Sequence, residues 1–401
     1  MTDAQKKVER NLRLLIVYTI CANGLFILPV IVPYYRDEIG LGFREFMIGE
    51  AAFSTLMILM EVPTGWISDV WGRRKTLMAS AAAQVAGWSL LLYADSFLTA
   101  VMAQAALAVA VSLFSGTNSA MLYDSLLEAG REDEYRRLEG RRLGLGLYSI
   151  GIASMLGGFM YQVHHMLPLV ATIISMMVGF VVTFLMKEPS WHRQAVHKNP
   201  FADMAVTFRY ALRGHPEVGG IILLSAILFA STKMLMWAQQ PYYMALGIPE
   251  GWFGALAACG FLLGGTASAI GHRLDGRFSN VGVLRTLLIW AVLAAAGAGV
   301  WSGAHGVVLL MSGSFIFGIG WSRVQAAINK RVVSGRRATI LSCASLMVHM
   351  FSIPLLVLTG TMQEWQGIGA SLMLLAFLLL TVGGTASLLL KKRSAPVVPG
   401  H

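Results

Sequence analysis

Long apolar segments alternate with short polar connections along the whole chain. The segments cover residues 12–34, 43–68, 75–94, 97–127, 140–163, 166–187, 216–245, 251–271, 284–302, 306–329, 339–361 and 366–390. A helix of about 20 apolar residues spans a hydrocarbon layer of about 30 Å. The apolar runs are continuous rather than alternating, which favours helices over barrel strands. The pattern therefore predicts an all-α integral membrane protein with twelve transmembrane helices.

Basic residues gather on alternate connections and predict the orientation of these helices. Of the 31 Lys and Arg residues, only Arg36 and Arg44 fall on the opposite connections, and Lys233 lies within a span. The other 28 share one side, including Arg142, which is assigned to the connection after the fourth span. Because Lys and Arg favour the cytoplasmic side of a membrane, both termini are expected in the cytoplasm.

Composition narrows the class of protein. Only 13% of residues are charged, 56% are hydrophobic and the mean hydropathy is +0.64, whereas soluble domains are about 25% charged. This excludes a soluble enzyme, a disordered chain and a secreted disulfide scaffold. The net charge of +10 is explained by the topology, so no nucleic-acid partner is expected. The common nucleotide-binding and hydrolase motifs are absent, and we expect no enzyme activity, cofactor or metal site.

The longest polar connection divides the chain into two halves. We expect an N-terminal six-helix bundle at 1–187, a cytoplasmic linker at 188–215, a C-terminal six-helix bundle at 216–393 and a cytoplasmic tail at 394–401. In the linker, Asn199-Pro200 suits a helix start, and apolar residues then recur every three or four positions. This predicts a short amphipathic helix on the membrane surface, with a plain flexible linker as the alternative.

A charged motif follows the second span and has a degenerate copy in the second half of the chain. The motif reads Gly65-Trp-Ile-Ser-Asp69-Val-Trp-Gly72-Arg73-Arg-Lys, and the related segment at 268–277 has His272 where Asp69 stands in the first. A repeat at about half the chain length suggests two structural repeats, as in many transporters.

Twelve spans, a central connection and this motif resemble the major facilitator superfamily, in particular its bacterial drug exporters. The resemblance implies two pseudo-symmetric six-helix bundles that expose a central cavity alternately to each side, in a monomer of the bacterial inner membrane. It also implies proton-coupled export of a small amphipathic molecule, so that protons, substrate and the lipid bilayer are the expected partners. Two departures are that the fourth span lacks a mid-membrane Arg and that the fifth lacks the Pro of the antiporter motif.

Other functions stay open within and beyond this class. The alternatives within transport are an exporter of a carboxylated metabolite or siderophore and an importer of the same fold. A membrane-embedded enzyme and a sensor or structural membrane protein are the alternatives outside it. Substrate flux that an uncoupler abolishes would separate transport from these.

The resemblance also implies a conformational latch at the cytoplasmic side. It comprises Gly65, Asp69, Gly72 and Arg73 of the motif with Asp124, an acid at the inner end of the fourth span. Gly72 permits a tight turn between the spans. The alternative is a permanent ion network without a gating role.

Charges inside spans are costly and therefore point to function. Glu61 lies eight residues before Asp69, about 12 Å into the membrane, and His349 lies at a similar depth in the eleventh span. We interpret Glu61 and His349 as a proton-coupling pair, with a helix-packing hydrogen bond as the alternative. Glu50 lies nearer the outer face and is expected at a gate or an interface.

Two further groups of polar residues are candidate substrate contacts. Lys233, Trp237 and Gln240 share one helical face, where an ammonium group beside an aromatic ring suits an anionic substrate; the alternative is a snorkelling Lys. In the first and fourth spans, which by resemblance line the cavity, the candidates are Tyr18, Asn23, Ser115, Asn118 and Ser119. Their alternative role is to hold helices together through hydrogen bonds.

Overall fold

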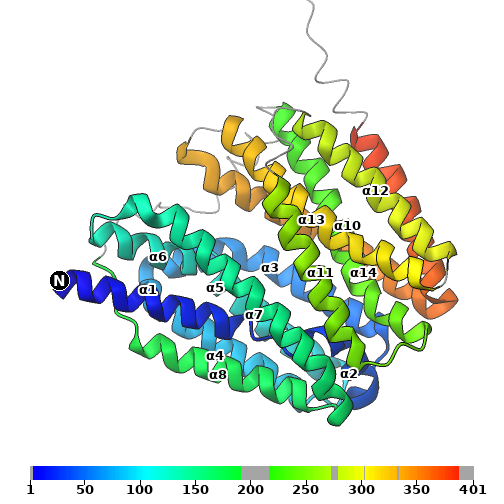
Figure 1. Cartoon of the computed structure of the whole chain (residues 1–401), viewed down its shortest axis with the longest axis horizontal. Coiled ribbons are helices and arrows are strands. Elements are labelled where there is room, and N and C mark those ends of the chain that lie inside the picture. Colours follow the sequence, from blue (N-terminus) through cyan, green and yellow to red (C-terminus); the bar gives the residue numbers. More distant parts are fainter. Residues whose placement is uncertain (1–2, 191–215, 272–278, 302, 332–333, 388–401) are drawn as a thin grey trace, which may run out of the picture. The chain divides into compact units, whose positions relative to one another are not determined.

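The computed structural model describes residues 3–190, 216–271, 279–301, 303–331 and 334–387, and all regular structure within them is helical (Figure 1). In chain order the elements are α1 (Asp3–Ala22), η1 (Leu28–Val30), α2 (Ile31–Tyr34), η2 (Tyr35–Ile39), α3 (Phe43–Trp71), α4 (Arg73–Leu92), α5 (Phe97–Phe114), α6 (Thr117–Glu128), η3 (Glu132–Glu134), α7 (Tyr135–Val163), α8 (Leu167–Leu185), α10 (Pro216–Ala245), α11 (Gly251–Ile270), α12 (Asn280–Val300), α13 (Ala304–Arg331), α14 (Ser334–Leu378) and η6 (Leu379–Gly383).

Eight of the described helical segments are long and apolar enough to cross a membrane, or nine if the two parts of the bent α3 count as one span. The prediction of an all-α membrane protein is confirmed at this level. The number of twelve spans stays a prediction. One of the eight segments, Ser342–Ser387, is 46 residues long and bends at Gly367, where φ is 84°.

The described residues form two compact units. Unit 1 contains the residues up to Ser190 together with Ile248–Cys259, and unit 2 contains the rest. The grouping of Ile248–Cys259 with unit 1 differs from the predicted division of the chain, because the start of α11 packs on α7. A Cβ at Gly158 would lie 2.8 Å from the backbone nitrogen of Gly254, so only glycines allow this approach. The predicted amphipathic helix and the C-terminal tail lie outside the described residues.

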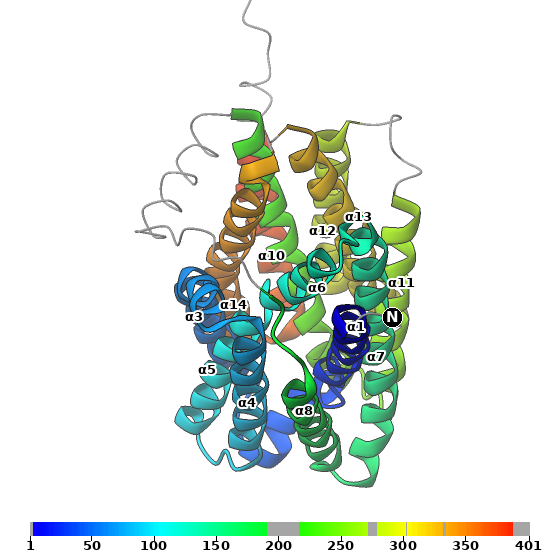
Figure 2. The same cartoon turned by 90° about the vertical axis from the view of Figure 1, so that its left-hand side faces the viewer.

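Unit 1 is built around an apolar core between α1, α4, α6 and α8. Leu15, Leu77, Met121 and Leu126 are fully buried there. In the same unit α4 packs on α5 and α8, and α5 packs on α3; Figure 2 shows α3, α4 and α5 side by side. In unit 2, α10 packs against α13 and α14, and α12 packs against α13 and α14.

Two predicted spans are interrupted. The fourth is divided into α5 and α6 by Ser115 and Gly116. The φ of Gly116 is 72°, a backbone conformation that residues other than glycine rarely adopt. The first ends as a regular helix at Ala22 and continues through the short elements η1, α2 and η2. Apolar content averaged over a whole span does not reveal such breaks, although the residues at them, Ser115-Gly116-Thr117-Asn118 and Asn23-Gly24, are of the types that favour turns.

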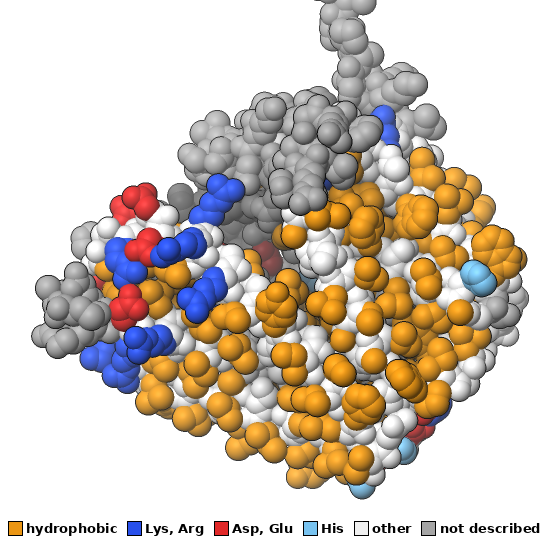
Figure 3. All heavy atoms as spheres, in the orientation of Figure 1, with side chains coloured by type: hydrophobic (Ala, Val, Ile, Leu, Met, Phe, Trp, Pro, Cys, Tyr) orange, Lys and Arg blue, Asp and Glu red, His pale blue; other side chains and the backbone are white. Residues whose placement is uncertain are grey.

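The surface of the molecule is divided between apolar and charged regions. In Figure 3 apolar side chains cover most of the visible face, and charged side chains gather at the end of unit 1 that carries the N-terminus. Large apolar residues on α7, among them Leu147, Ile152 and Phe159, are exposed. Exposed apolar side chains over whole helices are expected where lipid replaces water as the solvent.

Candidate functional site

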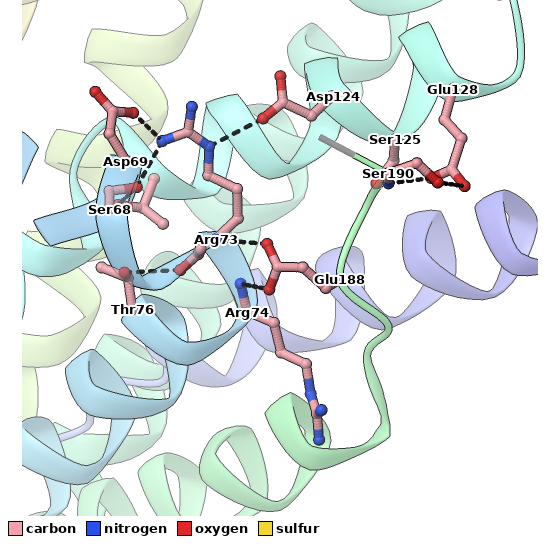
Figure 4. A network of polar contacts seen from close by, with 12 residues as sticks. Ser68, Asp69, Arg73, Arg74, Thr76, Asp124, Ser125, Glu128, Glu188 and Ser190 are labelled. Atoms are coloured by element: carbon pink, nitrogen blue, oxygen red, sulfur yellow. Dashed lines mark hydrogen bonds and ion pairs between the residues drawn. The ribbon is translucent and has the colours of Figure 1, made fainter. Parts of the chain in front are cut away.

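An arginine-centred ion-pair cluster lies where α3, α4 and α6 meet in unit 1 (Figure 4). Arg73, the first residue of α4, donates from Nη1 to Asp69 Oδ1 at 2.7 Å and to Ser68 Oγ at 2.8 Å, and from Nε to Asp124 Oδ2 at 2.9 Å. Three predicted latch residues thus come together, and we call Ser68, Asp69, Arg73 and Asp124 the Arg73 cluster. Gly65 lies on α3 where an added Cβ would meet no described atom within 4 Å.

The fifth predicted latch residue, Gly72, makes the turn into α4. Its φ is 93°, a conformation that favours glycine, and a Cβ there would lie 2.8 Å from Glu188 Oε1 and displace that carboxylate. The Glu188 carboxylate accepts the backbone N–H of Arg73 at 2.7 Å and that of Arg74 at 2.9 Å (Figure 4). A carboxylate that accepts from these first amides caps α4, and its negative charge interacts favourably with the positive end of the helix dipole. Sequence reasoning missed Glu188.

The segment that follows α8 is bonded to unit 1 on both sides of Glu188. The backbone of Lys187 exchanges two hydrogen bonds with the Asn11 side chain, at 2.8 and 2.9 Å. Ser190 Oγ donates to Glu128 Oε1 at 2.6 Å, and Lys7 bonds the same carboxylate at 2.7 Å. Residues 187–190 thus connect α1, α4 and α6 at the end of unit 1 that carries the Arg73 cluster.

A second arginine-centred cluster lies between α1, α6 and α7. Arg142 of α7 donates from Nε and Nη2 to the two oxygens of Glu139 at 2.8 and 2.7 Å, which makes a bidentate pair. Ser119 Oγ of α6 accepts from Arg142 Nη2 at 3.3 Å and donates to Glu139 Oε1 at 2.7 Å. Thr19 Oγ1 of α1 accepts from Arg142 Nη1 at 3.3 Å and from Asn118 Nδ2 at 3.4 Å. We call these five residues the Arg142 cluster.

The position of Arg142 corrects the sequence analysis. Its side chain is 5% exposed and that of Glu139 is 16% exposed, whereas the sequence analysis assigned Arg142 to a connection. The reason is that α7 begins at Tyr135, so that Arg142 lies two turns inside it. The Glu139-x-x-Arg142 spacing, which puts both side chains on one helical face, was the available signal.

Close contact of α1 with α7 builds the second cluster. Gly146, one turn after Arg142, lies against α1, and a Cβ there would lie 3.1 Å from Asn23 Nδ2 and 3.2 Å from Thr19 Cγ2. Asn23 Nδ2 donates to Thr19 O at 2.8 Å. A larger residue at 146 would separate the two helices and move Thr19 away from Arg142.

The other candidates on the first and fourth spans lie apart from this cluster. Tyr18 belongs to the apolar core of unit 1, where it is 1% exposed, and its hydroxyl donates to Leu77 O at 3.4 Å. Ser115 is exposed and ends α5 at the break between α5 and α6. Of these predicted contacts, Ser119 bonds the buried charges directly, and Asn118 joins them through Thr19 Oγ1.

In unit 2 the structure brings together residues for which different roles were predicted. Lys233, Trp237 and Gln240 lie on α10, with Trp237 and Gln240 less than a tenth exposed. His349 of α14 lies within electrostatic reach of Lys233. Its Nδ1 atom is buried without a hydrogen-bond partner among the described residues. The two groups thus form one basic site of α10 and α14.

Glu50 and Glu61, the two acids predicted to lie inside the second span, occupy different positions along α3. Glu50 is 8% exposed. Glu61 is partly buried and lies at the point where α3 bends by 51°, just before Pro63. A proline inside a helix removes a hydrogen bond and clashes with the preceding turn, which accounts for the bend.

Charged residues also meet at the opposite end of α3, in front of its first turn. Arg36 Nη2 bonds Glu250 Oε1 at 3.3 Å, and the Tyr161 hydroxyl donates to Asp37 Oδ2 at 2.7 Å. Burial acts to raise the pKa of Asp37, but the bonds from Arg36 and Tyr161 and the positive charge of Arg36 outweigh it and hold this pKa below its ordinary value. Asp37 therefore stays ionised at neutral pH and ties η2, which precedes α3, to α7.

The family is decided by a comparison with family models. The model of the major facilitator superfamily matches residues 14–338 of the chain. The chain belongs to the major facilitator superfamily. It is therefore a multi-pass membrane transporter that binds a small-molecule substrate, and it is not an enzyme. A search of curated protein sequences finds no significant match.

Solved structures of superfamily transporters share this fold. The nucleoside transporter NupG has a TM-score of 0.76 at 14% identity, with 96% of this chain and 99% of that chain covered. A POT family transporter in complex with 5-aminolevulinic acid has a TM-score of 0.71 at 12% identity, covering 96% and 97%. The peptide transporter POT in complex with sulfate has a TM-score of 0.67 at 13% identity, covering 97% and 99%. At these identities the likeness concerns the fold alone.

Proposed function

We propose that the chain is a proton-coupled secondary active transporter of a small amphipathic molecule, working by alternating access. The observation that carries this proposal is the presence of ionisable groups inside the spans of a superfamily member, since such groups are costly to place in a membrane and therefore mark functional sites. The decisive experiment is flux into proteoliposomes under an imposed pH gradient, with a panel of amphipathic substrates. We expect accumulation that an uncoupler abolishes, and its absence for every compound would contradict proton coupling.

The proposal includes twelve spans in two six-helix bundles, as a monomer in the bacterial cytoplasmic membrane with both termini in the cytoplasm. A helix of 46 residues such as Ser342–Ser387 would be about 69 Å long, too long for one crossing, so a bend at Gly367 that separates two crossings supports the count. A cysteine introduced at the exposed Glu364 should react with an impermeant reagent from the outside only. Labelling from the cytoplasm would contradict the topology.

Glu61 and His349 are the proposed proton-coupling groups. A carboxylate and an imidazole are the side chains that most often carry protons in proteins, and here the first lies at a helix bend and the second within a span. In proteoliposomes, Glu61→Gln and His349→Gln should each uncouple substrate flux from the pH gradient while downhill exchange continues. Wild-type coupling in both variants would contradict this assignment.

The proposed substrate contacts are Lys233, Trp237 and Gln240 in unit 2 and Asn23, Ser115, Asn118 and Ser119 in unit 1. The burial of Tyr18 in an apolar core favours a packing role for that residue instead. A cation close to an imidazole suits a substrate with negative charge. Lys233→Ala should therefore weaken transport of anionic compounds and leave that of cationic compounds unchanged.

The Arg73 cluster is the proposed latch. Its ion pairs join α3, α4 and α6 within unit 1, so they would act by fixing the end of α3 rather than by bridging the two units. Breaking and reforming the Asp69–Arg73 pair during the transport cycle would cost little, because Asp69 is 52% exposed. Asp69→Asn should slow transport at normal expression, and normal transport would contradict the latch.

Export is the direction that the resemblance to drug exporters favours. The second candidate is a transporter of the same fold that imports a carboxylated molecule, and one observation favours it. A buried arginine with a bidentate carboxylate partner has the geometry with which proteins recognise carboxylates. Flux measured in both directions under the same proton gradient separates the two candidates.

A further inference from the structure

The Arg142 cluster is a charged site inside unit 1 that the latch does not use. We propose that it binds a substrate carboxylate bearing an adjacent hydroxyl or amino group, and that this carboxylate enters as Glu139 takes up a proton. The inference rests on the proposed proton-coupled transport and names the substrate class. The inference is drawn from the unused hydrogen-bond donors and acceptors of the cluster and from the balance of its charges.

The guanidinium of Arg142 is not fully used. It has five N–H hydrogens, of which Nε bonds Glu139, the two on Nη2 bond Glu139 and Ser119, and one on Nη1 bonds Thr19. The remaining Nη1 hydrogen has no acceptor among the described residues. Release of Glu139 would expose a planar fork of donors that fits a second carboxylate.

An acceptor in the same cluster is also unsatisfied. Asn118 is 2% exposed, and its Oδ1 atom is buried without a hydrogen-bond partner among the described residues. Leaving a buried polar atom unbonded costs free energy, which a ligand could recover by donating a hydrogen. Asn118 and Arg142 both bond Thr19 Oγ1, so donor and acceptor sit side by side. A carboxylate with an adjacent hydroxyl or amino group satisfies both.

Charge balance links this carboxylate to a proton. Arg142 and Glu139 together are neutral, and Arg142 is 5% exposed. Protonation of Glu139 alone would leave a buried positive charge without a partner, and entry of a carboxylate alone would leave an excess negative charge; each is costly. Proton and carboxylate therefore bind together, and each raises the affinity for the other.

The groups around Glu139 allow it to be the proton acceptor. Its side chain is 16% exposed, which gives water more access to it than to Arg142. The titratable groups that face it are Arg142 and Tyr135 on α7, and Tyr123 of α6, whose ring meets that of Tyr135. From α6 Ser119 adds a hydroxyl, and from α1 Thr19 adds another near Arg142. Glu139 is thus the one acid among these groups.

Co-binding has a consequence for direction. If proton and carboxylate occupy the site together, they cross together, and an inward proton gradient drives the carboxylate inward. The Arg142 cluster thereby favours the importer among the proposed functions. Export against protons would require the opposite linkage, in which protonation expels the substrate.

Mandelate tests the inference, because it is an amphipathic 2-hydroxycarboxylate. Phenylacetate lacks its hydroxyl group, and mandelamide lacks its charge. Binding is measured by calorimetry on the full chain in nanodiscs from pH 8 to pH 5. We expect mandelate affinity to rise toward lower pH, by up to about tenfold per unit for one linked proton, with weaker binding of phenylacetate and none of mandelamide.

Variants then assign the effect to residues. Glu139→Gln mimics the protonated acid and should bind mandelate tightly at every pH. Arg142→Gln in the same background, E139Q/R142Q, keeps the cluster neutral and should bind none. Asn118→Ala should remove the preference for mandelate over phenylacetate. Arg141→Gln, on the exposed side of the same helix, is the control and should behave as wild type.

Several results would overturn the inference. They are mandelate binding that is absent or independent of pH in the wild type, or that persists in E139Q/R142Q. Proton-driven flux that survives unchanged in Glu139→Gln would refute this site while leaving the proposed function standing. Loss of proton-driven flux in the wild type for every compound would instead refute the proposed function itself.

Discussion

Unit 1 holds two arginine-centred clusters that differ in access to water and in charge. Arg73 meets two carboxylates, Asp69 and Asp124, of which the first is 52% exposed. Arg142 is 5% exposed and meets a single carboxylate, Glu139. The first cluster has an excess negative charge, and water screens its exposed member Asp69, whereas the second cluster is neutral. Where water is excluded, charges must balance within hydrogen-bonding distance, and this makes a buried pair responsive to one added proton or anion.

The largest effect expected from this difference is on stability. Arg142→Ala leaves Glu139 without its partner and should lower the free energy of unfolding by about 3–5 kcal/mol. The double variant E139Q/R142Q, which leaves no uncompensated charge, should lose much less. Unfolding in mixed micelles measures both. If Arg142→Ala cost no more than the loss of an exposed pair, the two clusters would not differ as described.

Within the Arg73 cluster, loss of the more buried carboxylate, Asp124, should cost more stability than loss of the more exposed one, Asp69. Asp124 is 17% exposed, so Asp124→Asn should lower the free energy of unfolding by about 1.5–3 kcal/mol, as for hydrogen bonds to charged groups. Asp69→Asn should cost about 1 kcal/mol or less. The same unfolding assay compares the two, and equal losses would show that exposure does not separate them.

Removal of the cap on α4 should have a moderate effect. Glu188→Ala deletes the acceptor for the first two amides of α4 and should cost about 1 kcal/mol. Glu188→Gln keeps one acceptor oxygen and should recover part of the loss. Glu132→Gln, an exposed acid in η3, is the matched control. An Ala variant as stable as this control would argue against the cap.

The smallest expected effect is that of salt. At 1 M the Debye length is about 3 Å, so the stability difference between wild type and Asp69→Asn should vanish. The difference between wild type and Arg142→Ala should remain, because the buried pair is screened much less. Repeating the unfolding measurements at 0.1 and 1 M salt tests this. An equal response of both differences would remove the contrast between the clusters.

The sequence predicted the Arg73 cluster far better than the Arg142 cluster. Asp69 and Arg73 are four residues apart in one motif, and Asp124 was expected beside them from the family resemblance. Arg142 was assigned to a connection because four other arginines precede it between residues 131 and 141. Burial of one among several neighbouring arginines depends on where α7 begins and on which helices pack against it.

Contacts between residues that are far apart in the sequence could likewise not be predicted from local patterns. Glu188 caps a helix that begins 115 positions earlier, and nothing in its own neighbourhood indicates this. The breaks at Gly116 and after Ala22 were missed because the spans were assigned from hydropathy averaged over about 20 residues, which hides short turn-forming runs such as Ser115-Gly116-Thr117-Asn118 and Asn23-Gly24. The proximity of Lys233 to His349 depends on the packing of α10 on α14, which the sequence does not reveal.

By itself the sequence determined the solvent and the class of fold. Long apolar segments and few charges require a membrane and helices, because only helices satisfy their backbone hydrogen bonds within one segment. Tertiary structure alone decided which polar groups share a site. The convergence of Thr19, Ser119 and Arg142 depends on the close approach that Gly146 permits between α1 and α7, and such crossings are a property of packed surfaces rather than of any local pattern.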